Sequence, residues 1–94
     1  MVHRETVEGY EGSLAQLVEA VGDLKYDSLA EFLRLLAMKV ERDGAKDHAR
    51  GRARLAAALQ DSAAQIAAAV VGIETAWRIS KPHMTESRSG LTKP

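Results

Sequence analysis

Hydrophobic side chains between residues 13 and 22 recur at intervals of three and four, which is the spacing of one face of an amphipathic helix. The stretch opens with Ser13-Leu-Ala-Gln16, a capping box in which the serine hydroxyl and the glutamine side chain each satisfy an otherwise free backbone N–H. Gly22 can adopt the left-handed conformation that closes a helix. We therefore predict a short helix from Ser13 to Gly22, with an apolar face formed by Leu14, Leu17, Val18 and Val21.

The same pattern repeats from residue 28, where Ser28-Leu-Ala-Glu31 has the form of a second capping box. The apolar side chains that follow keep the helical spacing and are Leu29, Phe32, Leu33, Leu36, Ala37 and Val40. Gly44 offers the left-handed residue that would end this helix, as Gly22 does for the first. The pattern predicts a second helix over residues 28–44.

The longest periodic stretch lies between Asp47, which can cap a helix, and Pro82, which can stop one from beyond its end. Its apolar positions recur every seven residues in three rows. The large row is Leu59, Ile66 and Ile73, and the mostly small row is Leu55, Ser62, Ala69 and Ala76. A third row lies beside these two and consists of Ala63, Val70 and Trp77. Small rows let helix backbones approach closely, which favours tight, nearly antiparallel packing. We predict one helix from residue 47 to Ser80. Alternatively, the helix begins at about residue 52, because Gly51 is unfavourable inside a helix.

The three predicted helices differ in length, and this sets the architecture. At about 1.5 Å per residue, the third helix would extend about 50 Å and the second about 24 Å. We predict an all-α fold, a three-helix hairpin in which two shorter helices lie against one long C-terminal helix. Residues 13–80 would form this single helical domain, residues 1–12 a flexible N-terminal arm and residues 81–94 a disordered C-terminal tail.

The composition indicates that such a hairpin cannot cover its own apolar surface. Sixteen of the hydrophobic residues are alanine and only four residues are aromatic, and a chain of this length buries only about 60 to 65% of its unfolded surface. A second copy related by two-fold symmetry would bury the remainder in an antiparallel helical bundle. We therefore predict a homodimer. An unidentified protein is a further candidate partner for the same apolar surface. The interface candidates are Leu35, Met38, Leu59, Ile66, Val70, Val71, Ile73 and Trp77.

Charge is unevenly distributed although the chain is neutral as a whole, with 13 basic and 13 acidic residues. Residues 1–31 carry a net charge of −5 and residues 32–58 a net charge of +4. Opposite charges in separate segments can pair within one chain or across a dimer, where they set register and encounter rate more than affinity.

Residues that carry enzymatic chemistry are sparse. The sequence has no cysteine, and His3, His48 and His83 have no metal-ligand neighbour at helical spacing. Glycines occur singly, so the sequence contains no phosphate loop, dinucleotide fingerprint or nucleophile elbow. We expect no enzyme, no cofactor and no metal site. A weaker alternative is a site shared between subunits, on which three side chains could converge: Glu74, Arg78 and Tyr26.

Arg50, Arg52 and Arg54 at alternate positions form the sharpest local signal for polyanion binding, since arginine can bind phosphate through two N–H groups. On one continuous helix Arg50 and Arg54 share a face and Arg52 turns away, and nearby acidic residues weaken the potential. We therefore favour arginines that are solvated or paired between chains. The alternative function is a nucleic-acid-associated helical protein.

The sequence shows no export signal, because residues 1–8 are polar and acidic where such a signal is basic and then apolar. The longest uncharged stretch runs from Ser62 to Ile73 and has 12 residues, against about 20 for a membrane span. We expect a cytoplasmic protein without membrane contact.

Together these patterns predict a small, non-catalytic helical protein that self-associates and acts by protein–protein interaction, as an adaptor, regulator or assembly factor. Trp77 aligns with Ala63 and Val70 on the third helix. We expect its ring to pack on the first helix or on a partner chain, because a lone tryptophan at such a position is usually part of a packed surface.

Overall fold

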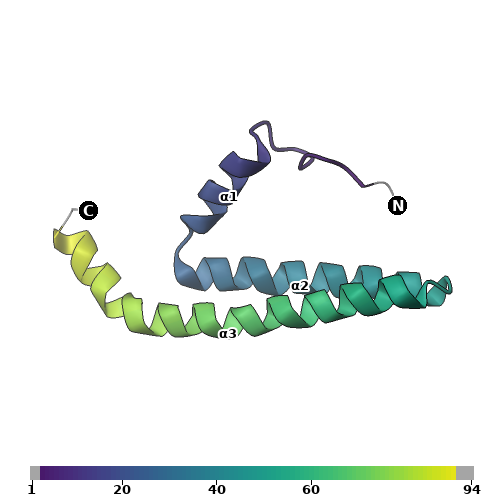
Figure 1. Cartoon of the computed structure of the whole chain (residues 1–94). Coiled ribbons are helices and arrows are strands. Elements are labelled where there is room, and N and C mark those ends of the chain that lie inside the picture. The colour runs from purple at the N-terminus through teal and green to yellow at the C-terminus, as the bar shows by residue number, and fades with distance from the viewer. Residues whose placement is uncertain (1–2, 91–94) are drawn as a thin grey trace.

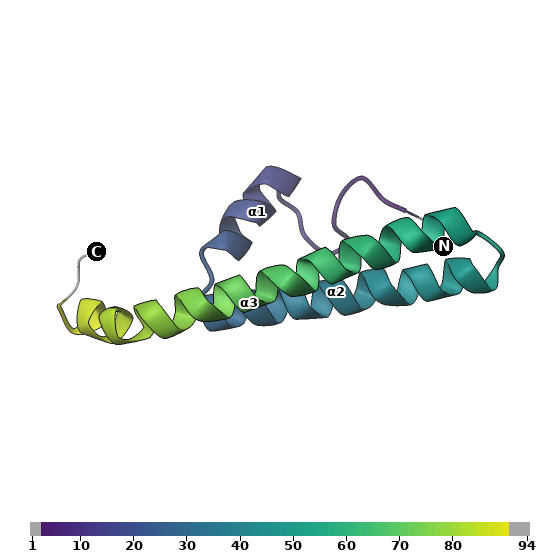
Figure 2. The same cartoon turned by 60° about the horizontal axis from the view of Figure 1, so that its bottom comes forward.

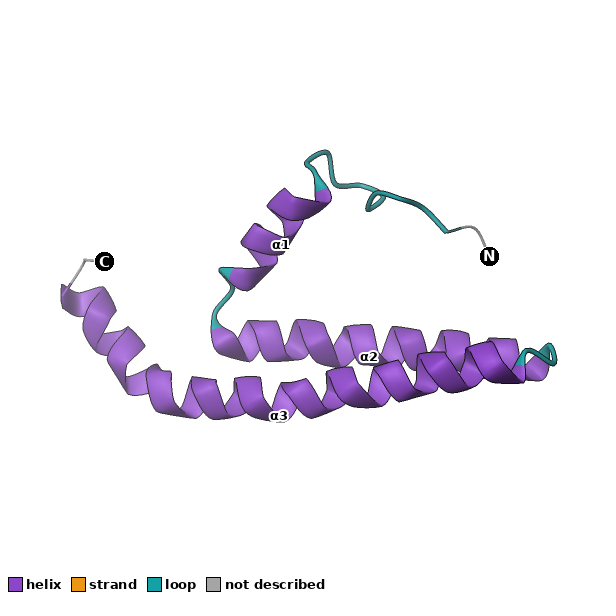
Figure 3. Cartoon of the chain, in the orientation of Figure 1, coloured by secondary structure: helices purple, strands orange, loops and turns teal. Residues whose placement is uncertain are grey.

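The computed structural model describes the backbone of residues 3–90 and the side chains of residues 3–82. Within those residues it has three helices and no strand: α1 is Leu14–Gly22, α2 is Tyr26–Ala49 and α3 is Ala53–Gly90 (Figure 3). Helices α2 and α3 run antiparallel and pack side by side (Figure 1). The predicted all-α helical hairpin is confirmed.

Helix α1 begins as the sequence predicts. The backbone N–H of Gln16 donates to the Ser13 hydroxyl at 3.1 Å, and the Ser13 N–H donates to the Gln16 side-chain oxygen at 2.7 Å, which completes the capping box. The prediction for Gly22 is wrong in its mechanism. The helix ends at Gly22, but this glycine is not left-handed and the next residue, Asp23, keeps a right-handed conformation.

Helix α2 is longer than predicted at both ends. It begins at Tyr26, so Ser28 lies inside the first turn and the predicted second capping box is wrong. At its other end the helix continues through Gly44 to Ala49. Gly44 does not end the helix because it is buried against α3, where an added Cβ would lie 3.3 Å from the carbonyl oxygen of Ala56. This glycine therefore serves the close approach of two backbones and not the end of a helix.

The turn between α2 and α3 is closed by Gly51, whose φ is +80°. The Gly51 N–H donates to the carbonyl of His48 at 3.0 Å, and the Arg52 N–H donates to the carbonyl of Asp47 at 2.9 Å, which are the paired bonds of a Schellman motif. Asp47 thus belongs to the end of α2, and the prediction that it caps the third helix is wrong. The alternative start near residue 52 is confirmed, because α3 begins at Ala53.

Helix α3 continues through Pro82 to Gly90, so the predicted stop at Ser80 is wrong. A proline inside a helix lacks the N–H of one hydrogen bond and crowds the carbonyl four residues earlier, which bends the helix at a cost of about 3 kcal/mol. Figure 1 shows α3 changing direction near this end. The predicted tail over residues 81–94 therefore starts as helical backbone, and residues 91–94 lie outside the described residues.

The core of the hairpin is a double row of small residues, which we call the small-residue seam. Its members are all buried and are Ala30, Ala37 and Gly44 on α2 and Ala56, Ala63 and Val70 on α3. On each helix these residues lie seven positions apart. Across the hairpin, Ala30 corresponds to Val70, Ala37 to Ala63 and Gly44 to Ala56. The two residues of each pair are equally far from Arg50 in the sequence, as an antiparallel hairpin requires. Small side chains allow the two backbones to approach closely, as predicted from the alanine content.

The seven-residue period of α3 is predicted correctly, but the row that faces α2 is not. The predicted small row is mostly exposed, at Leu55, Ser62 and Ala69. The predicted large row is half-buried at the edge of the seam, at Leu59, Ile66 and Ile73. Because α2 also contributes alanine and glycine, the two helices lie too close together for a large side chain between them.

Helix α1 does not lie against α3, which corrects the predicted position of the first helix. It projects from the start of α2 after the connector at residues 23–25, and both views show it standing away from the hairpin (Figures 1 and 2). None of its nine residues is buried. The molecule is elongated along the hairpin (Figure 1), with principal extents of 56 × 30 × 14 Å.

Candidate functional site

The large hydrophobic side chains of this protein lie mostly on its surface. Among the described side chains, none larger than valine is buried. The large hydrophobic residues that are exposed are Val7, Leu14, Val18, Leu24, Tyr26, Phe32, Leu35, Leu36, Met38, Leu55, Val71 and Ile79. Single exposed apolar residues are ordinary, whereas apolar residues gathered on one face mark a binding surface. The grouping of these side chains therefore locates the candidate site.

One side of the hairpin gathers the largest of them, and we call it the arm face. Leu29, Phe32 and Leu36 follow one another at steps of three and four on α2 and therefore share one side of that helix. Asp43, seven residues after Leu36, continues this side and lines a pocket together with His3 of the N-terminal arm. The arm face consists of Leu29, Phe32 and Leu36 of α2 and, on α3, Leu55, Leu59, Ile66 and Ile73.

The other side of the hairpin is mostly alanine, and we call it the open face. A shallow groove there is lined by Ala37, Met38, Glu41, Ala63, Ala64 and Ala67. Val71 continues the row four residues beyond Ala67. Met38 is 52% exposed and Val71 is 64% exposed. The open face thus carries two larger apolar side chains on a floor of small ones.

Most of the predicted interface residues remain accessible to a partner. Leu35, Met38 and Val71 are exposed, and Leu59, Ile66, Ile73 and Trp77 are half-buried. Val70 is the exception, because it is 6% exposed and belongs to the small-residue seam. Phe32, Leu36 and Leu55 are exposed as well, although the helical spacing does not predict them as interface residues. The closeness of the two helices pushes such long side chains out of the seam.

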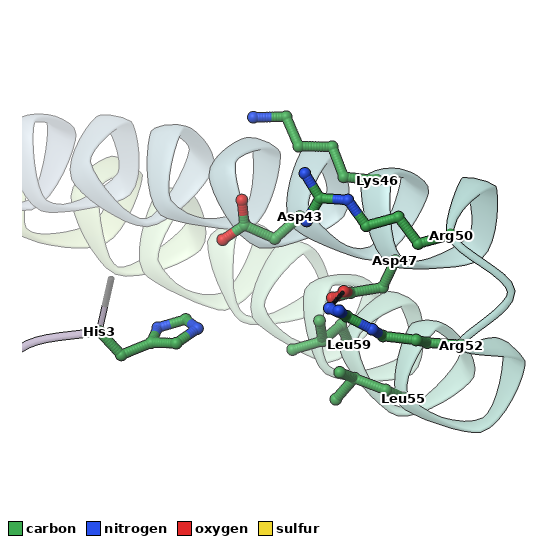
Figure 4. A pocket seen from close by; sticks show the side chains of 8 residues that line it. All are labelled: His3, Asp43, Lys46, Asp47, Arg50, Arg52, Leu55 and Leu59. Atoms are coloured by element: carbon green, nitrogen blue, oxygen red, sulfur yellow. Dashed lines mark hydrogen bonds and ion pairs between the residues drawn. The ribbon is translucent and has the colours of Figure 1, made fainter. Parts of the chain in front are cut away.

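A pocket of about 270 Å³ lies where the hairpin turns, beside the N-terminal arm (Figure 4). Its lining residues are His3, Asp43, Lys46, Asp47, Arg50, Arg52, Leu55 and Leu59. Arg50 and Arg52 thus share one site, which corrects the predicted divergence of their side chains, because the chain reverses at Gly51 between them. Arg54 is not part of the lining, so the three arginines do not form one cluster. Arg52 Nη1 donates to Asp47 Oδ1 at 3.0 Å, which offsets part of the positive charge.

Asp43 is the second carboxylate in this pocket. Lys39 Nζ donates a hydrogen bond to Asp43 Oδ2 at 2.6 Å. This bond, together with the nearby charges of Lys39, Lys46 and His3, holds the pKa of Asp43 below its ordinary value of 3.8, although desolvation acts in the opposite direction. Asp43 is therefore ionised across the physiological range, and the pocket contains both signs of charge.

We expect Lys39→Met to raise the pKa of Asp43 toward its ordinary value, because the hydrogen bond is the largest cause of the shift. A carboxylate whose pKa is lower in the folded chain than in the unfolded chain stabilises the fold above the unfolded pKa, and this contribution disappears as the pH falls through the folded pKa. The wild type should therefore be more stable than K39M at neutral pH and no more stable in acid. Carboxyl NMR titration and urea unfolding at several pH values measure both quantities.

Arg42→Met is the matched control, since it removes one positive charge from the same helix without removing a hydrogen bond to Asp43. An equal rise in the Asp43 pKa in both variants would contradict the role assigned to the Lys39 hydrogen bond.

Two of the three side chains considered for a site shared between subunits are engaged in other contacts within the chain. Arg34 Nη2 donates to Glu74 Oε2 at 2.5 Å and joins α2 to α3. Arg78 Nη2 donates to the Thr75 hydroxyl at 3.0 Å on the same helix. In the described part of the chain, no group of three His, Cys, Asp or Glu side chains is placed to hold a metal ion. Glu74 and Arg78 thus have structural partners, and Tyr26 is the first residue of α2.

Trp77 is half-buried and lies between two lysines. Lys25 Nζ and Lys81 Nζ are each 5.9 Å from the centroid of the Trp77 ring, within the range of a cation–π interaction. Lys25 belongs to the connector between α1 and α2. Trp77 therefore lies beside the connector.

One segment of α3, Ala53–Pro82, is long and apolar enough to cross a membrane by length and composition alone. Its most apolar window of 18 residues has a mean hydropathy of 1.3, and 17% of that window is buried. Helix α2 packs beside this segment and carries many charged side chains, at Asp27, Glu31, Arg34, Lys39, Glu41, Arg42, Asp43, Lys46 and Asp47. The bilayer core disfavours such charges strongly.

No protein-family model, no curated protein and no solved structure matches this chain, so its function is argued from the surfaces described above.

Proposed function

We propose that this is a small non-catalytic helical protein that acts by binding protein surfaces, first of all a second copy of itself, as an adaptor, regulator or assembly factor. One observation carries the proposal: the hairpin buries alanine, glycine and valine and exposes leucine, methionine and phenylalanine. Covering apolar surface contributes about 25 cal/mol per Å². A partner that covers these side chains would therefore supply stabilisation that the isolated chain lacks.

A second copy of the chain fits this requirement. In a two-fold symmetric dimer the same surface patch of both copies forms the contact. Each exposed apolar residue of that patch is therefore covered in both chains. The charge distribution supports the same partner, since the segment at residues 1–31 is acidic and the segment at residues 32–58 is basic. Charges of opposite sign on two segments of one chain are complementary between two copies in opposite orientation.

Sedimentation equilibrium over a wide concentration range tests the proposal. We expect a mass of twice the monomer value of 10.2 kDa that falls toward that value on dilution, with a melting temperature that rises with concentration because dimerisation stabilises the folded chain. A particle of 10.2 kDa that stays monomeric at every concentration and unfolds cooperatively would contradict self-association. Binding of such a monomer to phosphatidylcholine vesicles would point to a lipid surface as the partner.

A nucleic-acid-associated protein is the second candidate, and the convergence of Lys46, Arg50 and Arg52 in the pocket at the turn favours it. Fluorescence titration with a random DNA duplex separates the two functions. Binding that weakens steeply with salt, and that is lost in the double variant Arg50→Ala/Arg52→Ala but kept in Arg54→Ala, would support the second candidate. The two carboxylates in the same pocket, Asp43 and Asp47, are the reason that we rank it second.

A further inference from the structure

Helix α1 is too short to be stable without a surface to pack on. It has nine residues, whereas isolated helices below about 12 to 15 residues are marginal in water. Its capping box stabilises one end by about 1 kcal/mol. The rest must come from its apolar face, in which Leu17 and Val21 are half-buried but Leu14 is 57% exposed and Val18 is 60% exposed. Half of this face therefore lacks a contact that would hold the helix together.

The hairpin of the same chain does not supply this contact. Helix α1 stands away from α2 and α3 in both orientations (Figures 1 and 2). Its connector has only three residues and is attached at Lys25, whose ammonium group lies over the Trp77 ring at 5.9 Å. A short connector that is held at one end directs α1 outward. The helix is thus presented to the surroundings of the molecule.

The arm face has the properties that the face of α1 requires. Its exposed side chains, Phe32, Leu36 and Leu55, are large and apolar and match the aliphatic row on α1. The basic residues Lys39, Lys46 and Arg50 flank this face at its turn end. Helix α1 and the arm before it are acidic, at Glu5, Glu8, Glu11, Glu19 and Asp23. Apolar fit and opposite charge thus occur on the same two surfaces.

We propose that the apolar face of α1 packs on the arm face of a second copy, in a reciprocal exchange between the two chains; this inference rests on the self-association proposed above. Each copy then provides one short helix and one hairpin, and the two contacts are equivalent under two-fold symmetry. The exchange packs the exposed part of the apolar face of α1 and covers the largest apolar side chains of the hairpin.

Substitutions on the two proposed surfaces test the exchange in the full chain. Val18→Glu places a charge on the apolar face of α1, and we expect the dimer Kd to rise by about 100-fold. Ala20→Glu adds the same charge to an exposed position of α1 outside its apolar row, about 160° around the helix from Val18, and should leave the Kd within about threefold of the wild type. On the hairpin, Phe32→Glu on the arm face should act like Val18→Glu, and Met38→Glu, on the open face, should act like Ala20→Glu.

Cysteine cross-linking identifies which chain α1 contacts, because the protein has no cysteine of its own. A chain with Val18→Cys and a chain with Phe32→Cys, mixed and oxidised, should form a disulfide-linked heterodimer. The pair Val18→Cys and Met38→Cys is the matched control, because Met38 lies on the open face, and it should link far less. Both substitutions placed in one chain would close within that chain if α1 folded back on its own hairpin, and this result would overturn the exchange.

The outcomes separate the two proposals. A wild-type chain that is monomeric overturns both. A wild-type dimer that survives Val18→Glu and Phe32→Glu overturns the exchange and leaves self-association intact. A dimer that is lost only in Met38→Glu overturns the exchange and places the contact on the open face.

Discussion

Replacing Ala63 with leucine should cost the hairpin about 3 kcal/mol of unfolding free energy, the upper end of the usual range for overpacking. Ala63 is 3% exposed and lies in the middle of the small-residue seam. The added isobutyl group has no empty space to enter, because the seam brings two backbones together with only small side chains between them. The helices must therefore separate along the seam, which weakens the contacts of Ala30, Ala37 and Ala56 as well.

Ala68→Leu is the control for this substitution. It adds the same group to the same helix at an exposed position and changes helix propensity equally, so the unfolding free energy should stay within about 0.5 kcal/mol of the wild type. Urea unfolding followed by far-UV circular dichroism, at one fixed protein concentration, measures both variants. Equal stability of Ala63→Leu and Ala68→Leu would mean that the two helices are not held together by small residues.

The fold class of this protein is predictable from its sequence, because the signals for it are local. The capping box at Ser13 and Gln16 depends on four consecutive residues, and the spacing of apolar positions depends on one helix at a time. The end of α2 is different. Gly44 and Gly51 are equivalent as local signals, since either can supply a left-handed residue after an apolar stripe. Packing decides between them, because Gly44 faces Ala56 across the seam and Gly51 does not.

The candidate site is predictable only in part, for a related reason. Large apolar residues at helical spacing normally form the core of a helical protein, and by that rule the spacing alone assigns Phe32 and Leu36 to the same apolar face as Ala37. The signal that assigns them to the surface is the repeat of Ala30, Ala37 and Gly44 at seven-residue intervals. A repeat of small residues on one helix means little by itself. It becomes informative when the facing helix carries a matching repeat, and that pairing is a property of the fold.

The small-residue seam also explains why a protein of this kind depends on association. Alanine and glycine contribute little apolar area when they are buried, so close helix packing alone supplies limited stabilisation. The side chains that could contribute more lie on the arm face and the open face. Stability and partner binding are thus coupled in this chain, since the surface that strengthens the fold is the surface that binds.

Replacing Gly51 with valine should destabilise the hairpin by about 2 kcal/mol, because a β-branched residue is strained at positive φ. Gly51 has φ of +80° and forms the Schellman motif that reverses the chain between α2 and α3. An added Cβ would meet no atom within 4 Å, so backbone strain alone accounts for the expected loss. Gly51→Asn should recover more than half of it, since asparagine tolerates the left-handed conformation better than valine does.

Gly9→Val is the matched control. Gly9 has φ of +84° and equally open surroundings, but it lies in the N-terminal arm and not in the hairpin. The same strain there can relax by rearrangement of the arm, so the midpoint of urea unfolding should not change. If Gly51→Val and Gly9→Val had the same midpoint as the wild type, the turn would not depend on a left-handed residue, and the pairing of α2 with α3 would have to be set by the small-residue seam alone.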